Sequence, residues 1–560
     1  MSSRKLFLHE LNIDVLCHIL VMLHDVSRHS LLSVLCVNRV LYNITLPVLH
    51  RSCVLDYSPN RQQATIARLK SWLEDNSSIL SSIRHITVQG TPAYWRRHVS
   101  VKAPDTTKWA SLIQVLSQLS HLASFTFEYC EQLPIVLLNA LHRHHPSTHL
   151  HVRNWTRIAP EVPFGDPAEE ALANSPCLRS LHALFFTGTG PEADYRFSAF
   201  DRIVKLSPNL EDISRISRSG GGCVIYGYSS EQIEANGREI QKFAVDAPKC
   251  KCIKSLELDN VDAQMFQKLG AYIHPEQLIR LKSVQPSSDF LQLVTQHPTY
   301  KLCSLKHLDV HFGTRFWGPD PDSKINELVT GIAVFFQSCS PLESLTIVLQ
   351  TSRPWEPILS TILIHHGHSL RLLSLHQVES PKEESRRLCL SLDQLHDIRR
   401  ACQQLTSLAL DVDRTVDGQT EREYYAAIRG CNLRELTIHM DLGIAFFDSL
   451  VFFQLNDPSK LNEMAIVSKT KSYSEADESF VMEVWSAVVG TGIVEIPYLQ
   501  ELVLCMGEQN REIGHGYPAN WVCDEQHRRQ WARVRRSERD DRPREVNVKI
   551  RGGRLRQKAT

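Results

Sequence analysis

The 560-residue sequence predicts an α/β fold in two parts, a short all-helical N-terminal segment and a long solenoid of alternating strands and helices. Three observations predict the solenoid. An aliphatic-x-x-aliphatic-x-aliphatic hexad recurs along the second half of the chain, its copies start 25 to 38 residues apart, and most intervals carry helical spacing of apolar residues. A strand and a helix that return at such an interval are typical of stacked repeats.

Each hexad copy is short enough to be a single buried strand. The copies begin at Ile253 (IKSLEL), Leu305 (LKHLDV), Leu342 (LESLTI), Leu370 (LRLLSL), Leu405 (LTSLAL), Leu433 (LRELTI), Leu461 (LNEMAI) and Leu499 (LQELVL), with a weaker copy at Leu278. Chance alone would place about nine such hexads in a chain of this length, so the spacing and the helical intervals carry the prediction. The alternative is a non-repeating α/β domain with several strand–helix units.

Weaker versions of the pattern precede Ile253. They comprise candidate strands at 83–88, 122–127, 178–181 and 210–213, and a candidate helix from Trp109 to Leu119. We therefore expect the solenoid to span residues 83–506, with its clearest part from Ile253 onward. A connecting helix is expected within residues 58–82.

The hexads resemble leucine-rich repeats, in which the aliphatic residues face the core and parallel strands line one concave wall. The resemblance is irregular, because the position three residues after each hexad does not hold the Asn or Cys that is usual there. The side-chain ladder that ties adjacent turns in that family is therefore expected to be missing. We expect an irregular, helix-rich version with parallel strands on one face and helices on the other.

Alternation along each expected strand determines which side chains reach a ligand. On the strands of the eight full hexads these positions carry acids and histidines but no Lys or Arg, which favours a protein target with basic or hydrogen-bonding groups over nucleic acid. The candidate target-binding residues are Glu257, Asp259, His307, Asp309, His311, His376, Asp411, Glu435 and His439.

Residues 6–57 predict a group of small helices. Leu16, Ile19, Leu20 and Leu23 have the i, i+3, i+4, i+7 spacing of one helix face, and Asn12 stands where an N-cap is expected. About fifty residues of short helices are too few to bury this many aliphatic side chains among themselves. Some of this apolar surface must meet another part of the chain or another protein.

The same segment resembles the F-box family, in the form common in fungal proteins. Residues 11–16 (LNIDVL), 19–20 and Leu23 match the opening usually written Leu-Pro-x-Glu-Ile/Leu-Leu-x-x-Ile-Leu-x-x-Leu, and residues 32–39 and 46–55 match the remainder. The departures are Asn12 in place of Pro, Asp14 in place of Glu, and Val40 near the position where many members carry Trp. The resemblance covers roughly a tenth of the chain.

The resemblance implies that this chain is not an enzyme but a substrate receptor. The N-terminal helices would dock a Skp-family adaptor, which joins a cullin scaffold, and the repeats would hold an unidentified protein target for ubiquitination. The resemblance assigns the adaptor contact to Leu11, Asn12, Ile13, Val15, Leu16, Ile19, Leu20, Leu35 and Val37. Three alternatives stay open: an N-terminal hairpin that packs on its own domain, a repeat scaffold without a ubiquitin role, and an enzyme on an α/β domain.

Composition narrows the classes of partner. Lys plus Arg equals Asp plus Glu, at 62 each, so no bulk charge favours nucleic acid or an anionic membrane. Fifteen scattered cysteines without a recognisable secretory signal favour reduced thiols in the cytoplasm, the nucleus or both. No apolar run reaches the 18 residues that a membrane span needs.

No motif indicates catalysis, a cofactor or a metal. The clusters His142–His145 and His365–His368 lack Cys or carboxylate partners at zinc-site spacing, so we interpret them as surface-loop histidines. Phosphate-binding, nucleophile-elbow and metalloprotease motifs are also missing. Residues 507–560 are expected to form a C-terminal cap and a basic tail, with a short edge strand where Val546, Val548 and Ile550 alternate.

Overall fold

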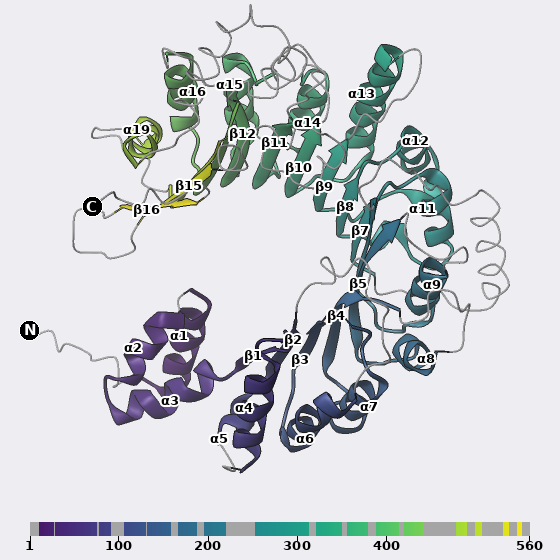
Figure 1. The fold of residues 1–560 in the computed structure, drawn as a ribbon. Helices are drawn as coiled ribbons and strands as arrows, with labels where there is room; N and C mark the ends of the chain where they lie inside the picture. The colour runs from purple at the N-terminus through teal and green to yellow at the C-terminus, as the bar shows by residue number, and fades with distance from the viewer. Residues whose placement is uncertain are drawn as a thin grey trace, which may run out of the picture. The chain divides into compact units, whose positions relative to one another are not determined.

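Two units make up the computed structural model, one of residues 1–220 and 224–253, the other of residues 221–223 and 254–560. The structure describes residues 11–26, 28–74, 78–90, 106–129, 131–157, 166–187, 195–219, 253–312, 321–349, 355–378, 388–413, 419–441, 478–489, 499–506, 530–536 and 546–551. Figure 1 shows the helices that connect the strands of each unit on one face of those strands.

The first unit begins with three short helices. They are α1 (Ile13–Val26), α2 (Arg28–Leu35) and α3 (Arg39–Leu49). The side chain of Asn12 accepts the backbone N–H of Asp14 at 2.9 Å, and Asn38 accepts that of Leu41 at 2.8 Å, so each Asn satisfies a donor at the start of a helix. Leu20, Leu31, Val48 and Leu49 form the small shared core.

Among the described residues of this unit, six parallel strands follow α3, each paired with the next in chain order. They are β1 (Ser52–Asp56), β2 (His85–Gln89), β3 (Ser124–Glu128), β4 (His149–Trp155), β5 (Leu178–Thr187) and β6 (Asp212–Ser219). The helices between them are α4 (Gln62–Glu74), α5 (Ser78–Ser82), η3 (Thr107–Trp109), α6 (Ala110–Gln118), α7 (Ile135–His144), α8 (Pro167–Ala173) and α9 (Arg196–Leu206).

The sheet starts earlier than the sequence predicts. Strand β1 lies inside the segment expected to be purely helical, and it pairs with β2 from Ser52 to Asp56. Helix α4 supplies partners for two of its carbonyl groups: Arg68 Nη2 donates to Val54 O at 2.8 Å and Thr65 Oγ1 donates to Asp56 O at 2.7 Å. The connecting helix expected within residues 58–82 is in fact two helices, α4 and α5. The hydrogen bonds from α4 protect the edge strand β1.

The described part of the second unit contains eight further parallel strands and two antiparallel ones. The parallel strands are β7 (Ser255–Asp259), β8 (Arg280–Val284), β9 (His307–Phe312), β10 (Ser344–Leu349), β11 (Leu372–Gln377), β12 (Ser407–Asp413), β13 (Glu435–Asp441) and β14 (Glu501–Met506). Strands β15 (Gln530–Arg536) and β16 (Val546–Arg551) continue the sheet in antiparallel orientation. The edge strand expected at residues 546–550 is thus confirmed.

The helices of the second unit vary in length more than its strands do. They are α11 (Ala263–Gly270), η4 (Pro275–Gln277), α12 (Ser288–Gln296), η5 (Pro298–Tyr300), α13 (Pro321–Ser338), α14 (Ile358–His366), α15 (Leu392–Ala401), α16 (Gln419–Arg429) and α19 (Glu478–Val489). Each repeat therefore has a strand of nearly constant length and a helical connection of variable length, as expected for an irregular solenoid.

The hexads identify the strands of this unit correctly. Every described strand from β7 to β14 begins two residues after the start of a hexad, including the weaker copy at Leu278. The aliphatic positions of each hexad are buried against the helices, as in β7, where Leu256 and Leu258 are buried and their neighbours are half-buried. The hexad at Leu461 lies outside the described residues. The α/β repeat prediction is confirmed at this level.

Adjacent turns are tied by hydroxyl groups, which the sequence prediction missed. Just before β4, Thr148 Oγ1 donates to Leu122 O at 2.6 Å, and before β11, Ser369 Oγ donates to Leu342 O at 2.8 Å. The ties lie where the chain enters the strands, whereas the expected Asn or Cys ladder would lie beyond their ends. A hydroxyl fits there because it can satisfy a carbonyl of the preceding turn in the buried layer.

Each of the two histidine clusters contains a buried histidine, so the surface-loop interpretation is wrong for His145 and His366. His145 Nε2 lies 2.7 Å from Leu116 O, and His366 Nε2 lies 3.0 Å from Phe336 O. Burial lowers the pKa of His366 to about 4, and the bond to the Phe336 carbonyl opposes this shift only in part. Both side chains therefore act as neutral hydrogen-bonding links between consecutive helices.

Candidate interaction surfaces

The three N-terminal helices expose an unusual number of apolar side chains. Of the large hydrophobic residues that are exposed in the described part of the chain, most lie on α1, α2, α3 or the turn after α2. They are Ile13, Val15, Ile19, Met22, Leu32, Val37, Val40 and Tyr42. We refer to these eight residues as the exposed apolar set. Few other parts of the described chain expose large apolar side chains at such density.

The arrangement of α1 explains why these side chains are exposed. Leu16, Leu20 and Leu23 share the helix face that packs on α2 and α3, and Leu20 belongs to the common core. Val15, Ile19 and Met22 have i, i+4, i+7 spacing on the neighbouring face, which the small bundle leaves uncovered. The helix is thus apolar on more of its circumference than its own bundle can cover.

The structure divides the nine predicted adaptor-binding residues. Ile13, Val15, Ile19 and Val37 are exposed, as a docking surface requires, and Ile13 and Val37 keep 61% and 65% of their surface accessible. The prediction needs correction for Leu16 and Leu20, which are only 1% exposed and support the surface from below. Leu11 and Leu35 are half-buried, and Asn12 is occupied as the cap of α1.

Sequence reasoning missed Met22, Leu32, Val40 and Tyr42 in this set. Met22 continues the Val15–Ile19 face by one helical turn, so the spacing contained a usable signal. The other three depend on how α2 and α3 pack, which spacing alone does not determine.

The face of β7–β14 opposite the helices, here called the wall, carries the nine candidate target-binding residues. In β9, His307, Asp309 and His311 are half-buried on the face opposite the helices, and the aliphatic residues between them are buried. Register aligns Asp411 on β12 with His439 on β13. Glu257, Asp259 and Glu435 lie on the same wall.

Four of these candidates are already engaged in pairs. His311 Nε2 lies 3.1 Å from Asp309 Oδ1, and His376 contacts Asp411. His376 Nδ1 lies 2.7 Å from Asp411 Oδ1, and the backbone N–H of Gln377 donates to Asp411 Oδ2 at 2.6 Å. The His439 ring lies 4.3 Å from that of His376, centroid to centroid. His376 and Asp411 are buried, so we interpret this pair as a structural link between β11 and β12. The more accessible residues of the wall are the better candidates for target contact.

The wall is not free of basic side chains, and that part of the prediction is wrong. The weaker hexad forms β8, which places Arg280 and Lys282 on the wall between β7 and β9. Lys282 Nζ pairs with Glu257 Oε1 at 2.8 Å, so this acid is partly neutralised. Acids still outnumber bases along β7–β14: Glu257, Asp259, Asp309, Asp411, Asp413, Glu435, Asp441 and Glu501 against Arg280 and Lys282.

The wall of the first unit carries a polar ladder that the sequence did not predict. His85 Nδ1 lies 2.8 Å from Ser124 Oγ across β2 and β3, and His151 Nδ1 lies 3.0 Å from Ser180 Oγ across β4 and β5. Burial, with Arg153 as the next cause, lowers the pKa of His151 to about 4. These histidines therefore act near neutral pH as uncharged hydrogen-bonding groups.

No described group of three or more His, Cys, Asp or Glu side chains is placed to hold a metal ion. The described helices likewise include none with the length and apolar character of a membrane span. When the sequence is compared with family models and with curated proteins, neither comparison gives a match.

Proposed function

We propose that this chain is the substrate-recognition subunit of an SCF-type cullin-RING ubiquitin ligase. Its N-terminal helices dock a Skp-family adaptor, and its strand wall binds a protein target. The exposed apolar set on α1–α3, in the segment that resembles an F-box, is the observation that carries the proposal.

Energetics favours a covered state for this segment. Complete burial of a Val, Ile or Met side chain is worth about 1.5–3 kcal/mol. Several such side chains are exposed together on helices whose own core holds only a few residues. A partner that covered them would gain several kcal/mol from water release alone.

The strand wall suits target recognition because its polar groups are presented from rigid strands. Parallel strands at a spacing of roughly 4.8 Å give an ordered array of side chains. The chain would perform no bond chemistry of its own. Its contribution would be proximity, since it would hold target lysines near a separate ubiquitin-conjugating enzyme. This role places the protein in the cytoplasm, the nucleus or both.

The test is affinity purification of the tagged full-length chain, followed by mass-spectrometric identification of the proteins recovered. We expect a Skp-family adaptor and a cullin in amounts comparable to the bait. Recovery of the folded chain with other proteins but without that pair would instead favour a repeat scaffold that has no ubiquitin role.

A further inference from the structure

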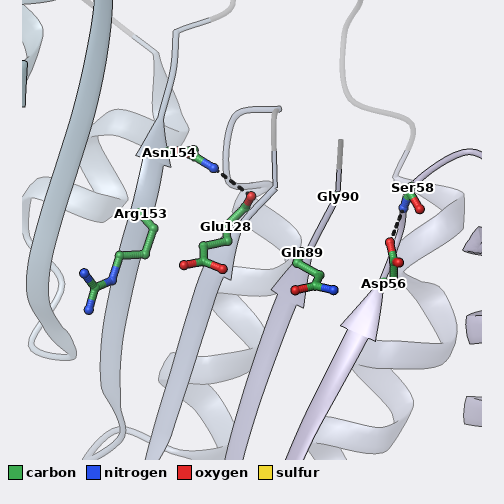
Figure 2. A pocket seen from close by; sticks show the side chains of 7 residues that line it. All are labelled: Asp56, Ser58, Gln89, Gly90, Glu128, Arg153 and Asn154. Atoms are coloured by element: carbon green, nitrogen blue, oxygen red, sulfur yellow. Dashed lines mark hydrogen bonds between the residues drawn. The ribbon is translucent and has the colours of Figure 1, made fainter. Parts of the chain in front are cut away.

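A hollow of about 690 Å³ lies at the carboxyl ends of the first four strands. Its lining comes from the last residues of β1, β2 and β3 and from the end of β4 (Figure 2). Open α/β sheets bind ligands at the carboxyl ends of their strands, because the chain leaves the sheet there and its loops diverge. None of the sequence patterns pointed to this hollow.

Three neighbouring strands end in groups of complementary hydrogen-bonding character. Register pairs Asp56 with Gln89 and Gln89 with Glu128, so an amide stands between two carboxylates. With adjacent strands roughly 4.8 Å apart, the Asp56 and Glu128 backbones lie about 10 Å from each other. Two anionic acceptors at that separation, with a neutral amide between them, can surround one extended cationic group.

The Asp56 carboxylate is held in its ionised form. Hydrogen bonds from the Ser58 side chain and backbone lower the pKa of Asp56, and the Ser58 N–H lies 2.9 Å from Asp56 Oδ1. Glu128 differs, because among the described residues its carboxylate takes part in no hydrogen bond or ion pair, while its backbone carbonyl accepts from Asn154 at 2.8 Å.

Arg153 borders the hollow but does not neutralise Glu128. Arg153 Nη1 lies 3.3 Å from His182 Nδ1, and His182 Nε2 lies 2.7 Å from Asp212 Oδ2. A neutral His182 that donates from Nε2 to Asp212 and accepts at Nδ1 satisfies both contacts. These contacts hold the guanidinium at the border of the hollow, and in Figure 2 it extends to the side of Glu128 that is away from Gln89. Its other N–H groups can donate to a ligand carbonyl or carboxylate there.

The base of the hollow is rigid. Gly90, which lines it, allows the Tyr129 ring to approach, since a Cβ at this position would lie 2.1 Å from a ring atom. Tyr129 packs edge-on against Trp109 and Phe127 in a buried aromatic cluster. The strand ends that carry Gln89 and Glu128 are thereby fixed in place.

We propose that this hollow binds a basic side chain of an extended protein segment. The cationic group would lie between Asp56 and Glu128 over Gln89, and Arg153 would bind a carbonyl oxygen of the same segment. This inference rests on the proposed function, because it assigns the hollow to target recognition and gives the target a required Lys or Arg.

The test uses ligand-observed NMR with the full-length protein and three short capped peptides. The probes are acetyl-Gly-Arg-Gly-amide, the same peptide with citrulline in place of arginine, and the same peptide with glutamate. Free arginine is added as a fourth probe, to separate peptide recognition from amino-acid binding. The variants are Glu128→Gln at the hollow and Glu327→Gln on an exposed part of α13 as the matched control.

We expect the arginine peptide to bind at least about tenfold more tightly than the citrulline and glutamate peptides, because a hydrogen bond to a charged group is stronger than one between neutral groups. Glu128→Gln should weaken it by a similar factor, and Glu327→Gln should have no effect. Equal binding of all peptides, free arginine as tight as the peptide, or insensitivity to Glu128→Gln would overturn the proposal.

Adaptor co-purification of the same proteins separates this inference from the proposed function. Adaptor binding without selective peptide binding would refute the hollow as a basic-residue site and leave the receptor proposal standing. Selective peptide binding without adaptor binding would refute the receptor proposal and leave the hollow standing as a site for basic side chains.

Discussion

Exchanging Ile13 and Val37 for Asp separates adaptor docking from folding. Both side chains are more than 60% exposed in the described structure, so their replacement removes few internal contacts. Surface substitutions of this kind change the free energy of unfolding by about 0.5 kcal/mol or less. We therefore expect the double variant to keep the wild-type melting temperature within a few degrees.

The effect on adaptor binding should be much larger. Complete burial of a Val or Ile side chain yields about 1.5–3 kcal/mol, and the exposed fractions of 61% and 65% leave roughly 1–2 kcal/mol per residue for the interface. The two substitutions should together cost about 2–4 kcal/mol, before the cost of burying charge is added. This corresponds to a weakening of the dissociation constant by roughly 30- to 1000-fold.

The matched control is Leu20→Asp. Leu20 is 1% exposed in the core of the helical bundle, so a charge there should unfold α1–α3. The assay is calorimetric titration of purified adaptor into each variant, with thermal melting measured in parallel. Unchanged affinity for the Ile13→Asp, Val37→Asp variant, with its fold intact, would refute the assignment of these side chains to the interface.

Three further predictions concern stability and the strand wall. Burial lowers the pKa of His366 to about 4, so the unfolded chain binds a proton at this site at higher pH than the folded chain does. The contribution of His366 to the free energy of unfolding should therefore fall by up to about 3 kcal/mol as the pH falls from 6.5 to 4. Urea unfolding of the His366→Gln variant should show a flatter pH dependence than that of the wild type. Tyr57→Phe removes a buried hydroxyl that has no hydrogen-bond partner among the described residues, and it should raise the free energy of unfolding or leave it unchanged. Tyr424→Phe removes the donor to Leu390 O and should lower the free energy of unfolding by about 1 kcal/mol. Charge reversal of Asp309 and Glu435 to Lys should weaken capture of the target at least tenfold, as measured by quantitative pull-down with adaptor binding as the internal control.

Each of these predictions has an outcome that contradicts it. Parallel pH profiles for His366→Gln and the wild type would show that the pKa of His366 is the same in the folded and unfolded states. A loss of stability in Tyr57→Phe as large as in Tyr424→Phe would reveal a partner for the first hydroxyl. Target capture that survives reversal of both acids would exclude the β9 and β13 part of the wall from the binding surface.

The repeating strands could be predicted because each strand requires the same pattern of buried aliphatic residues, and this pattern is visible in the sequence. A strand such as β9 needs inward aliphatic residues at fixed positions, and Leu305, Leu308 and Val310 supply them. The start of the sheet could not be predicted in the same way. Strand β1 has a single fully buried aliphatic, Leu55, and an exposed Val54, so its alternation is too weak to separate it from the preceding helix.

The candidate surfaces were predictable only in part, because exposure depends on packing between elements. The i, i+4 spacing of Leu16 and Leu20 marks an apolar face but does not say whether the bundle or a partner covers it. The hollow at the strand ends was missed for another reason. Asp56, Gln89 and Glu128 are brought together by sheet register, and no local sequence pattern connects residues more than thirty positions apart.

The central claim is that the exposed apolar set on α1–α3 is an interface for a separate adaptor. The most direct measurement is the molar mass of the full-length chain co-expressed with a Skp-family adaptor, determined by light scattering during size-exclusion chromatography. We predict one peak with the summed mass of one chain and one adaptor, and low solubility of the chain expressed alone. A folded, soluble chain that elutes at its own 63.9 kDa and leaves the adaptor in a separate peak would contradict the claim.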